Sequence, residues 1–463
     1  MTIATAPRRL PLMGNLLPLI FQRDSYFAKL RTLGDIVEVR FGATPYYLVN
    51  EPSAVHQLLI GDVRMIDKGR FFDIMRPFFG NGILTCPHAV HLDQRRMLQP
   101  AFNRATLASY LNRAVPGVVE RLVNESRGRA VDMLDEMSRM SITLMTNFCV
   151  SADNEAIERE IQHNLPIFVE GMISRAVLPS WVDKIPTPEN RRWNKAATDL
   201  RGAIYRSISA YRNAGVDHGD LLSMLLRSES ENGTALSDQD ICDQLLNILA
   251  AGSETTATSM AWFFYALGMH PDIEAGLLEE LDTTLGGRPP VVEDLPRLPR
   301  LNHALLETLR LYHPIWFLGR RATVPIKLGS DSFPANTEFI YSIATLHRDP
   351  TIYPAPLEFR PQRWQDSPGL RHSFIPFGSG VRRCMGDNFA LMEIGLIAAT
   401  LLQHWRLIPI AGQKLKRIAR ASIQPHAFKL RLEARAAAGS AHKHPYVPQS
   451  AAKSESQPIQ HYS

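Results

Sequence analysis

The sequence has few cysteines, no long run of charge of one sign, and no apolar run long enough to cross a membrane. Lys and Arg are scattered along the chain, and a net charge of +5 over 463 residues gives no sign of a nucleic-acid partner. The apolar stretch within the first 21 residues is short and is interrupted by prolines. We therefore expect a cytoplasmic protein without a membrane anchor. The cysteines match no zinc or disulfide spacing: Cys86, Cys149, Cys242 and Cys384.

Apolar residues are frequent enough to build a large core. Hydrophobic residues make up 45% of the chain and charged residues 21%, which is usual for a globular protein. No low-complexity linker and no repeat of fixed period divides the first 435 residues, so residues 1–435 are predicted to form a single domain. Residues 436–463 are rich in Ala, Ser, His, Gln and Lys without apolar periodicity, and we expect a disordered tail there.

Helical periodicity dominates the chain. The longest helix is predicted to begin at Ser237, which forms a capping-box pattern with Asp240, and to end at His270. A second helix is predicted over residues 301–312, and a third begins just after Cys384.

Strand patterns are concentrated near the start of the chain. Residues 33–60 combine β-branched and aromatic residues with turn formers, which predicts a hairpin followed by a helix. A further strand is predicted over residues 338–345. The fold class is therefore mainly α (α+β), with a small β-rich N-terminal part.

A glycine-rich segment, FGSGVRRCMG at residues 377–386, places a cysteine just before a helix. A lone buried cysteine is more often inert, as we expect for the other three. At Cys384, however, the unpaired N–H groups of the helix start are expected to lower the thiol pKa and to hold the anion. Gly378 and Gly380 permit a tight turn, and Gly386 lets the helix backbone approach a flat group closely.

This segment resembles the haem-ligand signature of the cytochrome P450 superfamily, and the resemblance covers residues 7–435. It implies the cytochrome P450 fold, a large helical domain around a buried haem b, with Cys384 as the axial ligand of the iron. Phe377 would shield the sulfur, and Gly378 and Gly386 would contribute to the haem site. The implied activity is that of a haem-thiolate monooxygenase, which inserts one atom of O2 into its substrate.

A second motif joins residues that are distant in sequence. Glu307 and Arg310 are three residues apart on one face of the predicted helix, which alone indicates a surface ion pair. Arg363 follows in the proline-bounded segment FRPQRW. The three residues resemble the buried Glu-Arg-Arg triad of the family, which implies a structural role.

Basic residues in three segments are candidates for binding the haem propionates. Each alone would more often be a solvated surface residue, although two of them stand at helical i, i+4 spacing. The family often has Pro-Pro after the glutamate helix, where this chain departs with His313 and Pro314. By resemblance, the propionate donors are His91, Arg95, Arg320 and Arg382.

The predicted long helix carries an acid and a hydroxyl, Glu254 and Thr255, within an apolar stretch. Helix hydroxyls bond to backbone carbonyls and Gly252 weakens the same turn, so a local groove is expected at Ala251. By resemblance, Thr255 would hydrogen-bond oxygen above the haem, and Glu254 would connect it through water to bulk protons. The alternative, a stripe of residues facing solvent, is disfavoured by the apolar flanks.

The substrate pocket is expected to be apolar and to suit a terpenoid or polyketide-like small molecule. By resemblance, its walls come from residues 70–84, from the groove at Ala251 and from residues 315–318, although several of these residues can equally be core. The segments KGRFFD and 81–102 are similar to those of bacterial terpene oxygenases. The candidate wall residues are Phe72, Phe79, Ala251, Trp316, Phe317 and Leu318.

The chain after Cys384 is too short for a flavin or nicotinamide domain, so a separate ferredoxin or flavodoxin with its reductase is expected to supply electrons. Basic residues at Arg95, Arg96 and Arg383 could receive such an acidic partner. Two alternatives remain. A peroxide-driven or rearranging haem-thiolate enzyme would not need the acid and hydroxyl of the long helix. A non-catalytic haem sensor would need neither a proton path nor a large apolar pocket.

Overall fold

The structure, a computed structural model, describes most of the chain. In this part, no helix combines the length and apolar character that a bilayer crossing needs. The predicted tail lies outside the described residues. These are residues 3–11, 13–22, 24–61, 63–126, 129–151, 155–172, 175, 182–229, 233–365, 373–419 and 422–435.

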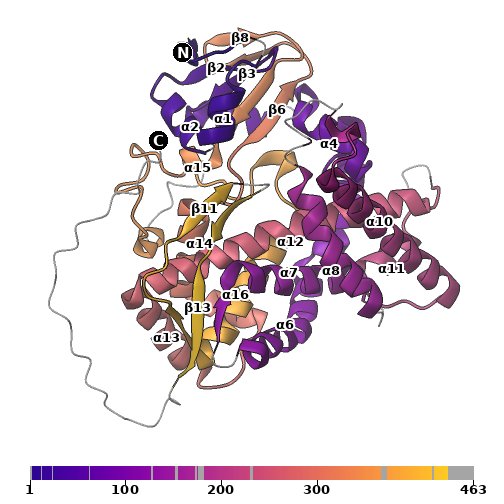
Figure 1. Cartoon of the computed structure of the whole chain (residues 1–463), viewed down its shortest axis with the longest axis vertical. Helices are drawn as coiled ribbons and strands as arrows, with labels where there is room; N and C mark the ends of the chain where they lie inside the picture. Colours follow the sequence, from indigo (N-terminus) through magenta and orange to yellow (C-terminus); the bar gives the residue numbers. More distant parts are fainter. Residues whose placement is uncertain are drawn as a thin grey trace.

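Helices form the larger part of the fold and surround one central helix, α12 (Asp238–Met269), which is about 48 Å long at 1.5 Å per residue (Figure 1). The predicted capping box is confirmed, because the side chains of Ser237 and Asp240 each accept a hydrogen bond from the other residue's N–H. The other helices are α1 (Leu16–Gln22), α2 (Asp24–Arg31), α3 (Pro52–Ile60), α4 (Arg70–Phe79), α5 (His91–Leu98), α6 (Arg104–Ser126), α7 (Met133–Cys149), α8 (Glu155–Glu170), α10 (Pro188–Ala214), α11 (Leu221–Arg227), α13 (Pro271–Leu285), α14 (Pro299–Leu311), α15 (Ile343–Leu346) and α16 (Asp387–His404).

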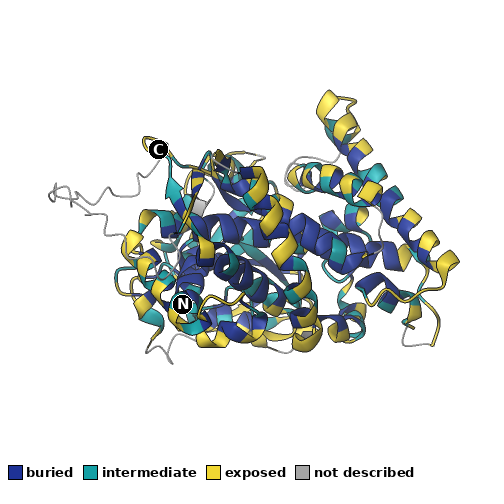
Figure 2. Cartoon of the chain, turned by 90° about the horizontal axis from the view of Figure 1, so that it is seen from below, coloured by how far each residue is buried: buried dark blue, intermediate teal, exposed yellow. Residues whose placement is uncertain are grey.

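The helix α12 is continuous through Gly252, where it packs against α7. A Cβ on Gly252 would lie 2.3 Å from the Cε of Met145 on α7, so a larger residue there would require the end of this flexible side chain to move. Most residues of α12 are buried, and Figure 2 shows buried helices through the middle of the molecule. The helix α12 is therefore a buried, central element of the fold, and the other parts of the site are described relative to it.

The main sheet has six strands in the order β1-β2-β3-β9-β6-β4. The predicted hairpin is confirmed as β2 and β3, but β6 and β9 come from beyond residue 317, so the β-rich part is not purely N-terminal. The strand predicted over 338–345 is wrong in its second half, because Ser342 caps the short helix α15. The strands of this sheet are β1 (Ile3–Thr5), β2 (Ile36–Phe41), β3 (Thr44–Val49), β4 (Ile66–Asp67), β6 (Leu318–Ala322) and β9 (Glu338–Tyr341).

Three smaller sheets complete the β structure, and one of them, the β7–β8 hairpin, lies beside the main sheet (Figure 1). A three-stranded sheet has the order β10-β13-β5, and two hairpins pair β11 with β12 and β7 with β8. Trp262 of α12 stacks on Tyr312 and donates to the Ile423 carbonyl at 2.7 Å, which ties α12 to the β11–β12 hairpin. These strands are β5 (Ala130–Asp132), β7 (Ile326–Leu328), β8 (Asp331–Phe333), β10 (Trp405–Pro409), β11 (Lys416–Ala419), β12 (Ile423–His426) and β13 (Lys429–Ala434).

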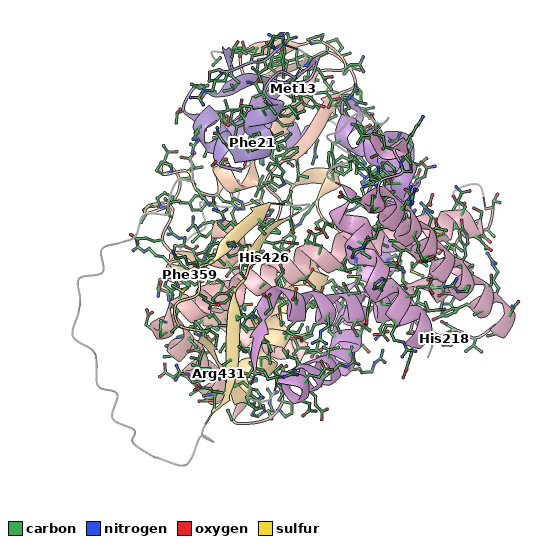
Figure 3. All side chains as sticks on the ribbon, in the orientation of Figure 1. Met13, Phe21, His218, Phe359, His426 and Arg431 are labelled. Carbon is green, nitrogen blue, oxygen red and sulfur yellow. The ribbon has the colours of Figure 1, made fainter. Side chains whose placement is uncertain are left out.

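The apolar stretch near the start of the chain lies partly on the surface. It forms the strand β1 and the short helix α1, separated by a turn. Phe21, which is 79% exposed, and Met13 both lie on the sheet part (Figure 3).

Candidate active site

The predicted cysteine segment is a loop that leads into α16. Gly378 and Gly380 have φ of +69° and +67°, so the left-handed conformations that a tight turn needs are present. The N–H of Cys384 donates to the Phe377 carbonyl at 2.8 Å and closes the loop. A Cβ on Gly380 would lie 2.1 Å from the carbonyl oxygen of Leu59 on α3, so no other residue fits there.

Cys384 is the one cysteine of the four with an accessible side chain, although protein surrounds its sulfur on most sides. Burial raises the pKa of the thiol to about 11, and the Gly386 N–H that hydrogen-bonds the sulfur only opposes this effect. The expected lowering by an N–H group at the helix start is present, but lost hydration outweighs it, so the pKa of the free thiol is raised and not lowered. A bound metal cation would supply what is missing, since coordination deprotonates a thiol.

Two buried histidines, not selected from the sequence, hold the start of this loop. His313 Nε2 donates to the Pro376 carbonyl at 2.8 Å, and its Nδ1 contacts the Ile315 backbone, 2.7 Å from the carbonyl oxygen and 3.1 Å from the nitrogen. His347 Nε2 accepts the Ile375 N–H at 3.0 Å. Burial lowers the pKa of both imidazoles, which favours these neutral forms. The departure from Pro-Pro thus places a hydrogen-bonding side chain under the cysteine loop.

The residues of the predicted triad lie together in the interior. Arg310 makes two hydrogen bonds to the Glu307 carboxylate, at 2.8 and 2.9 Å, and both side chains are fully buried. Arg363 Nε and Trp364 Nε1 each donate to the same carboxylate at 2.9 Å. Arg310 also donates to the His347 carbonyl at 2.9 Å, so the triad is connected to the cysteine loop through His347.

Three of the predicted propionate donors, His91, Arg320 and Arg382, lie in one region next to α5, the helix that carries His91 and Arg95. His91 is buried, and Arg382 and Arg95 both act on its pKa, which burial lowers to about 2. Arg382 forms an ion pair with Asp67 at 3.1 Å. Arg320 lies close enough to lower the pKa of Arg382, after the larger effect of burial.

Two further basic residues in this region were missed, Lys68 and His88. Lys68 Nζ donates to the carbonyls of Ile83 and Leu84, each at 2.6 Å, and burial together with neighbouring arginines lowers its pKa to about 7. His88 Nδ1 lies 2.8 Å from Arg382 Nη2. No local pattern marks either residue, because their partners are distant in sequence.

These basic groups fit the two carboxylates of a haem. Among the described residues, His91 Nδ1 and Arg382 Nε and Nη1 are buried without a hydrogen-bond partner. Burial disfavours the charged forms of these groups, as their lowered pKa values show, and a dianion placed among them would favour the charged forms and accept their hydrogen bonds. The basic cluster, defined as Lys68, His88, His91, Arg320 and Arg382, therefore suits the haem propionates. Arg95 is outside this cluster and donates to the Arg383 carbonyl.

The predicted acid and hydroxyl lie on α12 at half-buried positions. Thr255 Oγ1 donates to the Ala251 carbonyl at 2.8 Å, as expected for a helix hydroxyl. Glu254 Oε1 accepts from Ser422 Oγ at 2.6 Å and from Gln424 Nε2 at 3.1 Å, so the carboxylate is oriented by the segment that enters β12. Ala251 itself is exposed, which leaves this face of α12 open for a ligand.

The candidate pocket residues divide into two groups. Phe72, Phe317 and Leu318 are half-buried, so they have surface left to contact a ligand. Phe79 and Trp316 are 5% and 8% exposed and belong to the core clusters.

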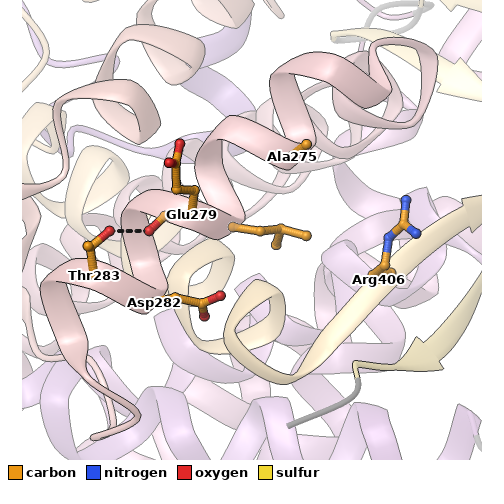
Figure 4. Close-up of a pocket in the computed structure, with 6 residues that line it drawn as sticks. Ala275, Glu279, Asp282, Thr283 and Arg406 are labelled. Atoms are coloured by element: carbon orange, nitrogen blue, oxygen red, sulfur yellow. Dashed lines mark hydrogen bonds between the residues drawn. The ribbon is translucent and has the colours of Figure 1, made fainter. Parts of the chain in front are cut away.

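A surface depression elsewhere contains none of the predicted site residues. It lies between α13 and β10, and Figure 4 shows its lining, which includes Glu279, Asp282 and Arg406. All three are engaged in ion pairs, among them Arg406 with Glu274 at 3.1 Å. Nothing there matches the chemistry around Cys384.

Replacing Glu307 by Gln tests the structural importance of the triad. The change leaves two buried guanidinium groups without their carboxylate, and we expect the free energy of unfolding to fall by about 3–5 kcal/mol. Denaturant unfolding measures this loss. Glu155→Gln is the matched control, because Glu155 pairs with Arg159 at an exposed position. Equal stability of the two variants would contradict the account.

Comparisons with known proteins agree with this geometry. The sequence profile of the family described as Cytochrome P450 matches residues 5–431. The retinoic-acid-bound cyanobacterial CYP120A1 superposes with a TM-score of 0.84 at 24% identity, covering 94% of this chain and all of that one, which shows the fold.

Similar curated proteins come from Streptomyces. Cyclooctat-9-en-7-ol 5-monooxygenase of Streptomyces melanosporofaciens is 38% identical, over 89% of this chain and 91% of that protein. Pentalenene oxygenase of Streptomyces avermitilis is 33% identical, over 93% of this chain and 97% of that protein. The chain therefore belongs to the cytochrome P450 family of haem-iron monooxygenases.

Proposed function

We propose that this monooxygenase inserts one oxygen atom from O2 into an apolar polycyclic terpenoid, with a polyketide-like natural product as the second substrate class. The observation that carries the proposal is the similarity to two enzymes named for cyclic terpene oxidation, over 89% and 93% of the chain. The half-buried apolar side chains of Phe72, Phe317 and Leu318 support a ligand of this kind. Residues 1–435 would act as a single domain.

Haem b, iron protoporphyrin IX, is the proposed cofactor, with Cys384 as the protein ligand of the iron. A thiolate-ligated haem supplies an electron-rich iron that activates O2. The chain would hold the propionates with the basic cluster and keep water from the sulfur with Phe377. Gly378 and Gly386 would allow the backbone to lie close to the ring.

Glu254 and Thr255 are the proposed route for protons. Thr255 Oγ1 carries one proton, which bonds to the Ala251 carbonyl and can turn toward a ligand by rotation about the C–O bond. Ser422 and Gln424 hold the Glu254 carboxylate one residue away, where water can link it to bulk solvent. Glu254 would thus return a proton, taken from water, to the Thr255 hydroxyl after that hydroxyl has donated its own.

The alternatives differ in what they require from the chain. A peroxide-driven or rearranging enzyme has no use for this route, and a haem sensor requires no turnover. Product formed from hydrogen peroxide as fast as from O2 and reductant would favour the first, and ligand binding without any turnover would favour the second.

Electrons are proposed to come from a ferredoxin or flavodoxin and its reductase in the cytoplasm. Arg96 and Arg383 have 74% and 56% exposed side chains near the cysteine loop, where an acidic partner could contact them. Each also has an acidic neighbour, Asp93 or Asp387, so the local excess of positive charge is modest.

Titration with cyclic terpenes tests the substrate class. We expect cyclic sesquiterpene or diterpene hydrocarbons to shift the iron from low to high spin, and a surrogate ferredoxin, reductase and NADPH to give hydroxylated product. A linear fatty acid with the same number of carbons is the matched probe and should cause no shift. A spin shift with polyketides and none with terpenes would overturn the terpenoid proposal.

Thr255→Ala tests the proton route. The variant should bind haem and substrate normally, whereas product formed per NADPH consumed should fall by at least about tenfold, with peroxide formed instead. Ser253→Ala is the matched control, because Ser253 also donates to a carbonyl of α12 but is buried. Unchanged coupling in Thr255→Ala would remove Thr255 from the mechanism.

A further inference from the structure

The loop after α4 lies directly on α12. Gly80 ends α4 with φ +73°, and a Cβ there would lie 1.9 Å from the Asp243 carboxylate of α12. A Cβ on Gly82 would lie 2.4 Å from the Asp243 carbonyl oxygen. The two glycines thus permit a contact between backbone and helix that side chains would prevent.

Buried side chains of α12 accept hydrogen bonds from the N–H groups of this loop. Asp243 Oδ2 accepts from Asn81 at 2.8 Å, and Gln244 Oε1 accepts from Ile83 at 3.0 Å. Asn247 Oδ1 accepts from Leu84 at 3.0 Å. The three acceptors, which we name the α12 clamp, are Asp243, Gln244 and Asn247, at 2%, 2% and 0% exposure.

The clamp also holds the end of α4. Asn247 Nδ2 donates to the Phe79 carbonyl at 2.9 Å and to the Asp243 carbonyl at 2.7 Å. Arg201 of α10 donates to the Phe78 carbonyl at 2.9 Å and pairs with Asp243 at 3.0 Å. The last carbonyls of a helix have no partner within it, so side chains from two other helices satisfy those of α4.

The position of the clamp relates it to the substrate site. Asn247 is four residues before Ala251, so both lie on one face of α12, one turn apart. On the opposite side of the loop, Lys68 of the basic cluster donates to the carbonyls of Ile83 and Leu84. The loop is therefore held between α12 and the region assigned to the haem propionates.

Packing alone does not explain why three buried side chains with amide or carboxylate groups lie within residues 243–247 of α12. Burying an amide or carboxylate is unfavourable unless each polar atom is bonded, and an apolar side chain would fill the same space without this requirement. Asn247 uses both its N–H donors, and its oxygen accepts from the Leu84 N–H. The Thr85 hydroxyl lies 3.2 Å from the same oxygen, but its one proton has a shorter bond to the Gly80 carbonyl at 2.7 Å. These bonds fix a loop that has no regular secondary structure.

We infer that the α12 clamp fixes α4 and residues 80–86 as a rigid wall of the substrate pocket, so that Asn247 is a positioning residue for substrate specificity. The inference rests on the proposed function, because it takes α4 as a pocket wall. A change in the clamp should alter the affinity of a ligand that contacts α4, but not the affinity of a ligand that binds only the iron.

The test compares Asn247→Leu with Gln403→Leu in the haem-loaded protein. Gln403 is the matched control, a buried amide near the end of α16 whose Nε2 donates to the Arg288 carbonyl. In Asn247→Leu we expect the amides of residues 81–84 to exchange hydrogen at least about tenfold faster. Clotrimazole, a bulky azole, should bind about tenfold more weakly, while imidazole should bind as before.

Several results would overturn the inference. The inference fails if hydrogen exchange at residues 81–84 is unchanged in Asn247→Leu, or if Asn247→Leu and Gln403→Leu have equal effects. It also fails if clotrimazole binds as before although exchange at residues 81–84 has become faster. Gln244→Met removes the bond to Ile83 alone and repeats the test with a smaller change if Asn247→Leu does not fold. Exchange reports on the clamp without turnover, so its failure is distinguishable from failure of the proposed function.

Discussion

A sulfur atom at position 384 can meet a metal only if the loop before α16 keeps its shape, and the regular structure within this loop is one short 3-10 helix, Gly380–Arg382. Its support comes from groups behind it. His313 and His347 bond the backbone of residues 375 and 376, and Arg310 holds the His347 carbonyl. Because Arg310 is fully buried, its charge requires a partner, and the Glu307 carboxylate provides it. The Glu307–Arg310 pair thus supports the loop that carries Cys384 through its contact with His347.

Burial also affects the charge of the basic residues around the proposed cofactor site. Burial is the largest cause that lowers the pKa of Lys68, His91 and Arg382. Neighbouring cations lower it further, while Asp67 raises the pKa of Lys68 and of Arg382. Charging all of these groups at once is therefore unfavourable for the protein alone. It becomes favourable when a dianion is bound, so part of the affinity for the haem would come from relief of this repulsion. The same argument applies to Cys384, whose thiol needs a cation to lose its proton.

Much of the site could be predicted from the sequence because its motifs combine residue type with spacing. The pattern ending at Cys384, the pair of Glu307 and Arg310, and the capping box at Ser237 depend on neighbours within ten residues, which a sequence displays directly. The central helix and the first hairpin were predicted for the same reason, since apolar periodicity is a local property. The mainly helical fold class followed from these elements.

The remaining features depend on partners far apart in the chain. Lys68 meets Arg382, and Asn247 meets Leu84, over separations that no local pattern records. The strand predicted over 338–345 ended early because the Ser342 hydroxyl caps a short helix. The pKa of Cys384 was misjudged because the helix start is visible in the sequence, whereas the burial of the sulfur is not.

The most direct test of the account is the spectrum of the reduced protein under carbon monoxide. Thiolate ligation by Cys384 predicts a strongly red-shifted Soret band in the unmodified protein and in Cys242→Ala, whose cysteine is buried elsewhere. The band should be lost in Cys384→Ala. A red-shifted band that persists in Cys384→Ala, or that never forms in the unmodified protein, would contradict the assignment of Cys384 as the iron ligand.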